Sequence, residues 1–187
     1  MLISVIERLD ANLVLKAKFK QSAEKFIRKL NKKKKIYVGV HVRKTDRIEF
    51  EKILGLEELR PSYYLQAMDL FRNYFGSKNC IFLVISDDAK WCQSNLIKKQ
   101  KDVFIASQNN LTEIESVGHD LAIMSQCNHT IMSRGTFSFW SSYLAGGGAT
   151  VLPCHLPAFR SPKHDIYQLC NRNPLENPLP RLFSQIV

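Results

Sequence analysis

The sequence predicts an α/β protein built on a parallel, Rossmann-like sheet. Three observations support this prediction. Short apolar runs alternate along the chain with helical patterns of roughly 10 to 15 residues, as they do in βαβ units. The runs are rich in β-branched residues, which is typical of strands buried on both faces of a sheet. Polar clusters follow directly after several runs, and no internal repeat or low-complexity stretch interrupts the alternation.

The first expected strand begins at Ile36, where IYVGVHVRKTD changes from an apolar run into a charged turn. Further strands are expected at 80–85, 103–106, 129–132 and 150–152. Helices are expected at 61–75, 89–99 and 114–127, and from Phe137 to the glycines at 146–148. Pro61 suits the first position of a helix, and Gly76 ends the same helix. The stretch 44–60 is expected to be a polar loop.

Composition divides the chain into a basic helical segment at 1–35, a Rossmann-like domain at 36–153 and a proline-rich tail at 154–187 that packs on the domain, with a short helix as one option. Residues 1–35 hold 11 Lys and Arg against 3 Asp and Glu, and so account for most of the net charge of +10. Because the basic charge is confined to that segment, we expect no nucleic-acid partner. Apolar residues in two helical phases predict a bent helix or two helices, and docking on a neighbouring domain is favoured over lying on a membrane.

Several reaction classes are excluded by missing motifs. The sequence contains no GxGxxG, GxxxxGK[ST], GxSxG or HExxH, which argues against dinucleotide, P-loop, serine-hydrolase and zinc-protease chemistry. Its five cysteines lack metal-ligand spacing, and Cys80 and Cys127 are expected to be buried thiols. Asp87 and Asp88 are adjacent, so they suit separate hydrogen-bond acceptors better than a metal clamp. No signal peptide is recognisable, and no run approaches the roughly 18 apolar residues that span a bilayer.

Polar side chains gather after three of the expected strands. The three clusters are His41 with Arg43 and Asp46, Ser86 with Asp87 and Asp88, and Ser133 with Gly135 and Thr136; Asp120, expected at a helix start, joins them. Ligands of open α/β sheets bind outside the carboxyl ends of the strands. There, Arg43 could chelate a diphosphate, and backbone N–H groups at 133–137 could bind the same phosphates. This pattern is that of a nucleotide-sugar site without a metal, although solvated strand ends would give similar clusters.

Three stretches resemble the α-1,2-fucosyltransferases of glycosyltransferase family 11. The most specific is HDLAIMSQCNHTIMSRGTFSFWSSYLAGGGATVLP at 119–153; VGVHVRKTD at 38–46 resembles the phosphate-binding motif of the family, and IFLVISDDAKWC at 81–92 resembles the strand between them. The resemblance implies the Rossmann-like donor domain of a GT-B-type fold. It further implies inverting, metal-independent transfer of L-fucose from GDP-fucose to the 2-hydroxyl of a terminal galactose on a glycan. It also implies a Golgi membrane or lumen location, although the membrane anchor expected in the family is not evident in this sequence.

Roles follow from the resemblance, position by position. Arg43 would bind the β-phosphate and assist departure of GDP, and Asp46 would orient Arg43. His41 would contact phosphate or fucose, with a packed histidine as the alternative. Asp120, or Asp87 as second choice, would read guanine or ribose, with helix capping as the alternative for Asp120. The expected donor-binding residues are His41, Arg43, Asp46, Ser86, Asp87, Asp120, Ser133, Gly135, Thr136 and Phe137; for Phe137, core packing is the alternative.

The acceptor proton requires a base, unless the departing phosphate takes it. Glu51 is the candidate catalytic base, although a solvated loop carboxylate is the favoured interpretation of both Glu49 and Glu51. Lys44-Thr45 departs from the usual Arg-Gly of the family motif and is closer to α-1,6-fucosyltransferases. The alternatives are therefore a fucosyltransferase of different linkage, such as an O-fucosyltransferase, and an inactive or truncated GDP-sugar-binding remnant. Asn110 and Asn128 begin glycosylation sequons, and occupancy is less expected at Asn128 because a buried strand follows.

Overall fold

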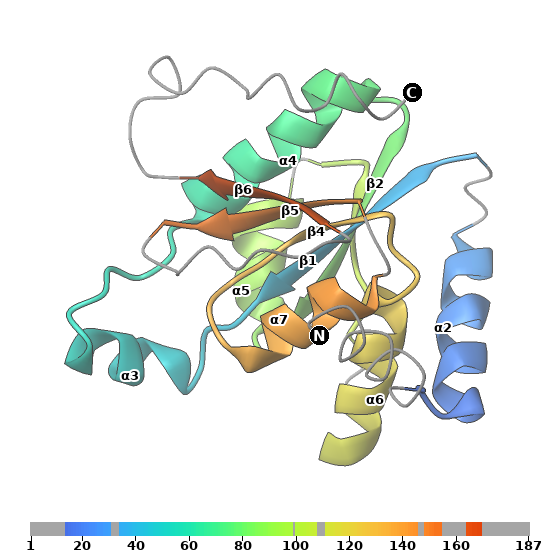
Figure 1. The fold of residues 1–187 in the computed structure, drawn as a ribbon, viewed down its shortest axis with the longest axis horizontal. Helices are drawn as coiled ribbons and strands as arrows, with labels where there is room; N and C mark the ends of the chain where they lie inside the picture. Colours follow the sequence, from blue (N-terminus) through green and yellow to red (C-terminus); the bar gives the residue numbers. More distant parts are fainter. Residues whose placement is uncertain are drawn as a thin grey trace, which may run out of the picture.

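The domain is a six-stranded parallel sheet with helices on both faces (Figure 1). The computed structural model describes residues 14–30, 34–98, 100–107, 111–145, 148–154 and 164–169. The strands are β1 (Ile36–Val42), β2 (Cys80–Ser86), β3 (Val103–Ile105), β4 (His129–Ile131), β5 (Gly148–Pro153) and β6 (His164–Leu169). Their order is β3-β2-β1-β4-β5-β6, and every neighbouring pair is parallel. This is the strand order of a Rossmann fold, so the predicted fold class is confirmed.

The helices divide between the two faces of the sheet. They are α2 (Ala17–Lys29), α3 (Arg47–Ile53), α4 (Pro61–Phe75), α5 (Ala89–Cys92), a π-helix η1 (Gln93–Ile97), α6 (Glu113–Met124) and α7 (Thr136–Leu144). The side chains of α4, α5 and η1 pack on one face of the sheet, and those of α2 and α6 pack on the other. Successive residues of a strand point to opposite faces of the sheet. In β1, Val38, Val40 and Val42 therefore point toward α4, while Gly39 faces Met124 of α6. A Cβ at Gly39 would lie 2.6 Å from Met124 Sδ, so glycine lets α6 approach the strand.

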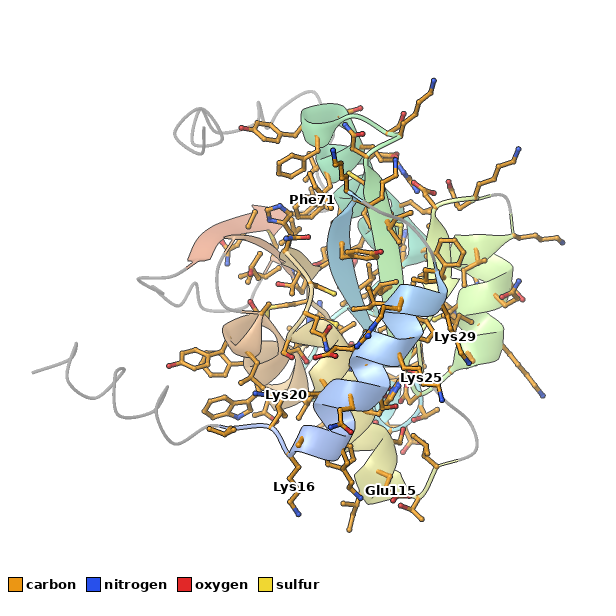
Figure 2. The ribbon with its side chains drawn as sticks, turned by 90° about the vertical axis from the view of Figure 1, so that its right-hand side faces the viewer. Lys16, Lys20, Lys25, Lys29, Phe71 and Glu115 are labelled. Atoms are coloured by element: carbon orange, nitrogen blue, oxygen red, sulfur yellow. The ribbon has the colours of Figure 1, made fainter. Side chains whose placement is uncertain are left out.

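Helix α2 is part of the expected amino-terminal helical segment, and it docks on α6 of the Rossmann-like domain. Phe19 lies against Gly118, where an added Cβ would come within 2.5 Å of the ring. Lys18 pairs with Glu115 of α6 at 3.3 Å. The apolar side of α2 is therefore covered, and its lysines lie along the exposed side (Figure 2). The helical pattern expected at 2–13 lies outside the described residues.

Two sequence predictions are wrong. The expected polar loop at 44–60 contains helix α3, and residues 164–169 of the expected tail form strand β6 at the edge of the sheet. Residues His164 and Asp165 are polar, so β6 has no buried-strand pattern; an edge strand needs none, because its backbone pairs with β5 alone. The expected helix at 89–99 is present but continues from α5 as a π-helix.

The prediction that Cys80 and Cys127 are buried thiols is confirmed. Cys80, Cys92 and Cys127 are buried thiols, and burial raises the pKa of Cys127 to about 12. Cys154 takes part in a disulfide bond. Within the described part of the chain, no helix combines the length and apolar character needed to cross a membrane.

Candidate functional site

The candidate site lies where the strand order reverses, between β1 and β4. From β1 the chain moves outward to β2 and β3, and from β4 it moves outward to β5 and β6. Loops diverge at such a reversal and leave a crevice at the carboxyl ends of the strands. Because β2, β1 and β4 are adjacent, the three polar clusters expected after these strands meet at one edge of the sheet (Figure 1).

Arg43 lies at the rim of this site and is held by two carboxylates. Its Nε and Nη2 donate to Asp46 Oδ1 and Oδ2 at 2.8 and 2.9 Å, which is a bidentate contact. Its Nε also lies 3.3 Å from Asp87 Oδ2. The Arg43 side chain is 42% exposed, so a ligand can reach it from solvent. Its orientation is set by Asp46, in keeping with the expected role of that residue.

Asp87 fastens the turn after β1 to the end of β2. Its Oδ1 accepts the backbone N–H of Lys44 at 2.9 Å, and its Oδ2 accepts the N–H and hydroxyl of Thr45 at 3.1 and 2.5 Å. Asp88 instead caps α5, where it accepts the N–H of Trp91 at 2.8 Å. The prediction that the two aspartates are separate acceptors is confirmed. Since both Asp87 oxygens are engaged, the geometry favours a positioning role for this residue over that of nucleoside reader.

Lys44 is buried, which its place in a charged turn did not indicate. Its side chain is 5% exposed, and Nζ lies 4.0 Å from the centre of the Trp91 ring. Nζ also donates to Glu58 Oε1 at 2.5 Å and to the Leu59 carbonyl at 3.0 Å. Lys44 therefore ties the turn after β1 to the segment that precedes α4.

His41 is buried beneath the loop that follows β4. Its Nδ1 lies 2.5 Å from Ser138 Oγ and 2.8 Å from Ser133 Oγ, and its ring packs on Phe137 with 4.6 Å between centroids. Burial lowers the pKa of His41 to about 3; Asp87 opposes this shift and Arg43 adds to it. A neutral imidazole in this setting supports the packed-histidine alternative, and both His41 and Phe137 support the loop from within.

The Ser133–Thr136 loop follows β4 and leads directly into α7. Gly135 has φ 112°, a conformation that favours glycine. The residue at the N-terminal cap position of α7 is Gly135, which has no side chain to cap the first turn. The first N–H groups of a helix lack intrahelical partners and carry positive dipole charge, so they suit an anion. Thr136, the first residue of α7, is exposed at this point.

Arg134 and Glu51 form a buried ion pair that the sequence did not reveal. Arg134 Nη1 donates to Glu51 Oε2 at 2.8 Å and to the Glu57 carbonyl at 2.8 Å, and the two side chains are 4% and 7% exposed. The interpretation of Glu51 as a solvated loop carboxylate is wrong, because Glu51 lies on α3 with its side chain turned inward. Glu49 is exposed. The pair joins α3 to the loop after β4.

Asp120 reaches the site from the middle of α6, not from a helix start as expected. The N-terminal cap position of α6 belongs to Thr112, so the capping alternative for Asp120 is also wrong. Ser107 Oγ donates to Asp120 Oδ2 at 3.4 Å and accepts the N–H of Ser86 at 2.9 Å. Asp120 is buried beside the carboxyl ends of β2 and β3, where a helix packed on the sheet can present a carboxylate to a ligand.

Other features do not coincide with this site. A cavity of about 430 Å³ is lined by Leu15, Lys20, Glu24, Ser125, Gln126 and Leu144, which lie beside α2 and at the carboxyl ends of α6 and α7. None of these residues belongs to the three polar clusters. Among the described residues, no group of three or more His, Cys, Asp and Glu side chains is arranged to hold a metal ion.

Comparison with known proteins identifies the family. The model of Glycosyl transferase family 11 matches residues 3–169. The galactoside α-(1,2)-fucosyltransferase 1 of Mus musculus is 42% identical over 118 residues, which cover 62% of this chain and 30% of that protein. The galactoside 2-α-L-fucosyltransferase SEC1 of Bos taurus is 36% identical over 142 residues, which cover 74% of this chain and 37% of that protein. The chain thus spans about a third of the length of these relatives.

A solved structure supports the fold. The glycosyl transferase family 9 structure from Veillonella parvula DSM 2008 superposes with a TM-score of 0.59 over 93% of this chain and 46% of its own, at 13% sequence identity. At that identity the likeness concerns the fold alone, and it agrees with the expected GT-B-type, Rossmann-like class. Since one family model matches nearly the whole chain, and matched relatives exceed 30% identity, the chain belongs to glycosyl transferase family 11.

Proposed function

We propose that this domain binds GDP-fucose and supports inverting, metal-independent transfer of L-fucose to the 2-hydroxyl of a terminal galactose on a glycan. The observation that carries the proposal is the setting of Arg43: an exposed guanidinium, oriented by Asp46, at the switch point of a family 11 domain. An arginine that is already oriented loses less freedom when it chelates a phosphate.

The diphosphate would lie between Arg43 and the first turn of α7. Arg43 would contact the β-phosphate, and the N–H groups at Thr136 and Phe137 would contact the same group from the other side. In the reaction, the bond between fucose C1 and the β-phosphate oxygen breaks as C1 bonds to the galactose hydroxyl oxygen. Arg43 and the helix dipole then stabilise the negative charge that develops on departing GDP. The Arg43 guanidinium and the helix dipole would together supply the charge stabilisation that a metal ion supplies in other transferases.

The proton of the acceptor hydroxyl needs a destination. Glu51 is the proposed base, and Arg134 binds Oε2 of its carboxylate in the ligand-free protein. The alternative is a dissociative reaction in which a phosphate oxygen takes the proton. Asp120, linked to Ser86 through Ser107, is the proposed reader of guanine or ribose.

A second candidate is a GDP-sugar-binding remnant without transfer activity. The observation in its favour is that Glu51, the candidate base, is buried and paired with Arg134. A fucosyltransferase of different linkage is a third candidate, because Lys44-Thr45 replaces the usual Arg-Gly. For location, we propose a Golgi membrane or lumen; the disulfide bond of Cys154 suits an oxidising compartment.

The test is transfer of radiolabelled fucose from GDP-fucose to lactose-type acceptors, with EDTA present, for the wild type and Arg43→Ala. Transfer by the wild type in EDTA, lost in Arg43→Ala, supports the proposal. GDP binding without transfer to any acceptor favours the remnant. Linkage analysis of the product separates 2-hydroxyl from 6-hydroxyl transfer. A wild type that fails to bind GDP rules out the donor site altogether.

A further inference from the structure

Two buried cations from different strand ends contact one short stretch of chain. Lys44, after β1, donates to Glu58 and to the Leu59 carbonyl. Arg134, after β4, donates to Glu51 and to the Glu57 carbonyl. We call residues 51–59 the bridging segment. It joins the loops after the two strands through Lys44 and Arg134, residues that are each 4% exposed.

Polar contacts, more than apolar packing, set the position of the bridging segment. At its outer end, the side chains of Ile53 and Leu54 are 81% and 53% exposed. Only Leu59, at the end nearest α4, packs against the main core. A segment with so little buried apolar surface would move freely unless the two cations held it. Conversely, each cation is fixed in place by the partners that the segment supplies.

The residues next to the two cations are those expected to bind the diphosphate. Lys44 follows Arg43 directly, and its backbone N–H is held by Asp87. Arg134 lies between Ser133, which contacts His41, and Gly135, whose φ of 112° turns the chain into α7. A shift of either cation therefore moves one half of the candidate site relative to the other.

We propose that Arg134 and Lys44 are positioning residues, which act through the bridging segment to hold Arg43 and the amino-terminal turn of α7 at the spacing that one diphosphate requires. This inference rests on the proposed function, because the diphosphate is that of the proposed donor. The backbone pairing of β1 with β4 covers only Val38–Val40 and His129–Ile131, so it ends before the loops that follow these strands. The bridging segment connects those two loops. The Nε of Arg134 is buried with no hydrogen-bond partner among the described residues, so burying this arginine costs free energy. A required position for Arg134 explains why the fold bears that cost.

The test compares conservative variants on both sides of each contact. Arg134→Lys keeps the charge, but the shorter side chain does not place its ammonium where Nη1 of Arg134 donates to both Glu51 and the Glu57 carbonyl. Glu58→Gln weakens the hold on Lys44 from a residue whose side chain is half exposed, so this variant is expected to fold. The matched control is Arg72→Lys, which breaks the partly buried ion pair of Arg72 with Asp102 (2.8 Å), beside the amino end of β3.

GDP affinity, measured by calorimetry well below the melting temperature of every variant, is the first measurement. We expect the Kd for GDP to rise about tenfold or more in Arg134→Lys and Glu58→Gln, since small displacements of binding groups cost affinity of this order. The control should lose thermal stability and keep its Kd within about twofold. Folded Arg134→Lys and Glu58→Gln proteins that bind GDP as the wild type does would overturn the inference.

Amide hydrogen exchange of the ligand-free proteins is the second measurement, and it separates the inference from the proposed function. Arg134→Lys should speed exchange at 133–137 and at 44–46 together, while Arg72→Lys should leave both loops unchanged. If the wild type binds no GDP, the proposed function fails, and exchange alone decides whether the two loops are coupled. Faster exchange confined to 133–137 in Arg134→Lys would show that the bridging segment does not couple them.

Discussion

The carboxylate of Asp87 holds Thr45 twice, through the backbone N–H at 3.1 Å and through the hydroxyl at 2.5 Å. Thr45 is one of the two positions, with Lys44, at which this chain differs from the Arg-Gly-Asp of the family motif that it resembles. A glycine at this position could keep the first hydrogen bond but not the second. The turn that carries Arg43 is therefore fastened to β2 by one more contact than a glycine would allow.

Replacement of Thr45 by glycine should lower the free energy of unfolding by about 1 to 2 kcal/mol, through the lost hydroxyl bond to a carboxylate and the greater freedom of glycine in the unfolded chain. Urea denaturation at neutral pH measures this change. Thr45→Ser retains the hydroxyl and should stay within about 0.5 kcal/mol of the wild type. Equal losses in Thr45→Ser and Thr45→Gly would show that the hydroxyl contributes nothing.

Arg43→Lys should reduce kcat/KM for transfer by roughly 100-fold, because a lysine keeps the charge but cannot bind Asp46 and a phosphate with the same fixed fork. Initial rates over a range of GDP-fucose concentrations measure the effect. Arg60→Lys, a change at an exposed arginine outside the site, is the control and should leave the rate unchanged. A wild-type rate in Arg43→Lys would show that charge alone suffices.

Acid should destabilise the domain through His129. Burial lowers the pKa of His129 from 6.5 to about 4, and its Nδ1 accepts the N–H of Ala149. Below pH 6.5 the unfolded chain binds a proton at this residue and the folded chain does not, so stability falls as pH falls from 6.5 to about 4. Between pH 7.5 and pH 5 the loss from His129 should be roughly 1 to 2 kcal/mol.

Urea denaturation of His129→Gln at both pH values isolates this contribution. The variant is less stable at pH 7.5, because the packing of the imidazole on Phe71 and Phe75 is lost. Its stability should nevertheless depend less on pH than that of the wild type. His41, whose pKa is also lowered, contributes in the same direction and remains in both proteins. An unchanged difference between the two pH values would contradict the assignment to His129.

Gly148→Ala should destabilise the domain by about 2 to 4 kcal/mol. Gly148 has φ 86°, and an added Cβ would lie 2.0 Å from the Asn128 carbonyl oxygen, which belongs to the backbone and cannot swing away. Thermal unfolding measures the loss. Gly55→Ala is the matched control, because Gly55 has φ 66° with nothing within 4 Å of the added Cβ. A loss in Gly148→Ala no larger than that in Gly55→Ala would show that the positive φ alone, and not the clash with the Asn128 carbonyl, causes the destabilisation.

Local patterns predicted most of the fold. Buried parallel strands are continuous apolar runs, so β1 and β2 could be recognised from their residues alone. Helix α4 carries its own start and stop in Pro61 and Gly76. Helix α3 was missed because RIEFEKI is short and charged, and an isolated sequence of seven residues has little helical tendency. Its helix depends on contacts that Glu51 makes with a distant part of the chain.

The sequence by itself determined the fold class, the family and which residues lie at the carboxyl ends of the strands. Each of these depends on the hydrophobic period and the motifs of short stretches, which can be recognised without knowledge of any distant contact. Tertiary structure alone decided the partners of those residues. Arg134 and Glu51 are 83 positions apart, and Lys44 is buried only because Trp91 and Glu58 surround it. A charged residue in a turn is normally solvated, and only packing between separate segments can bury it and pair it.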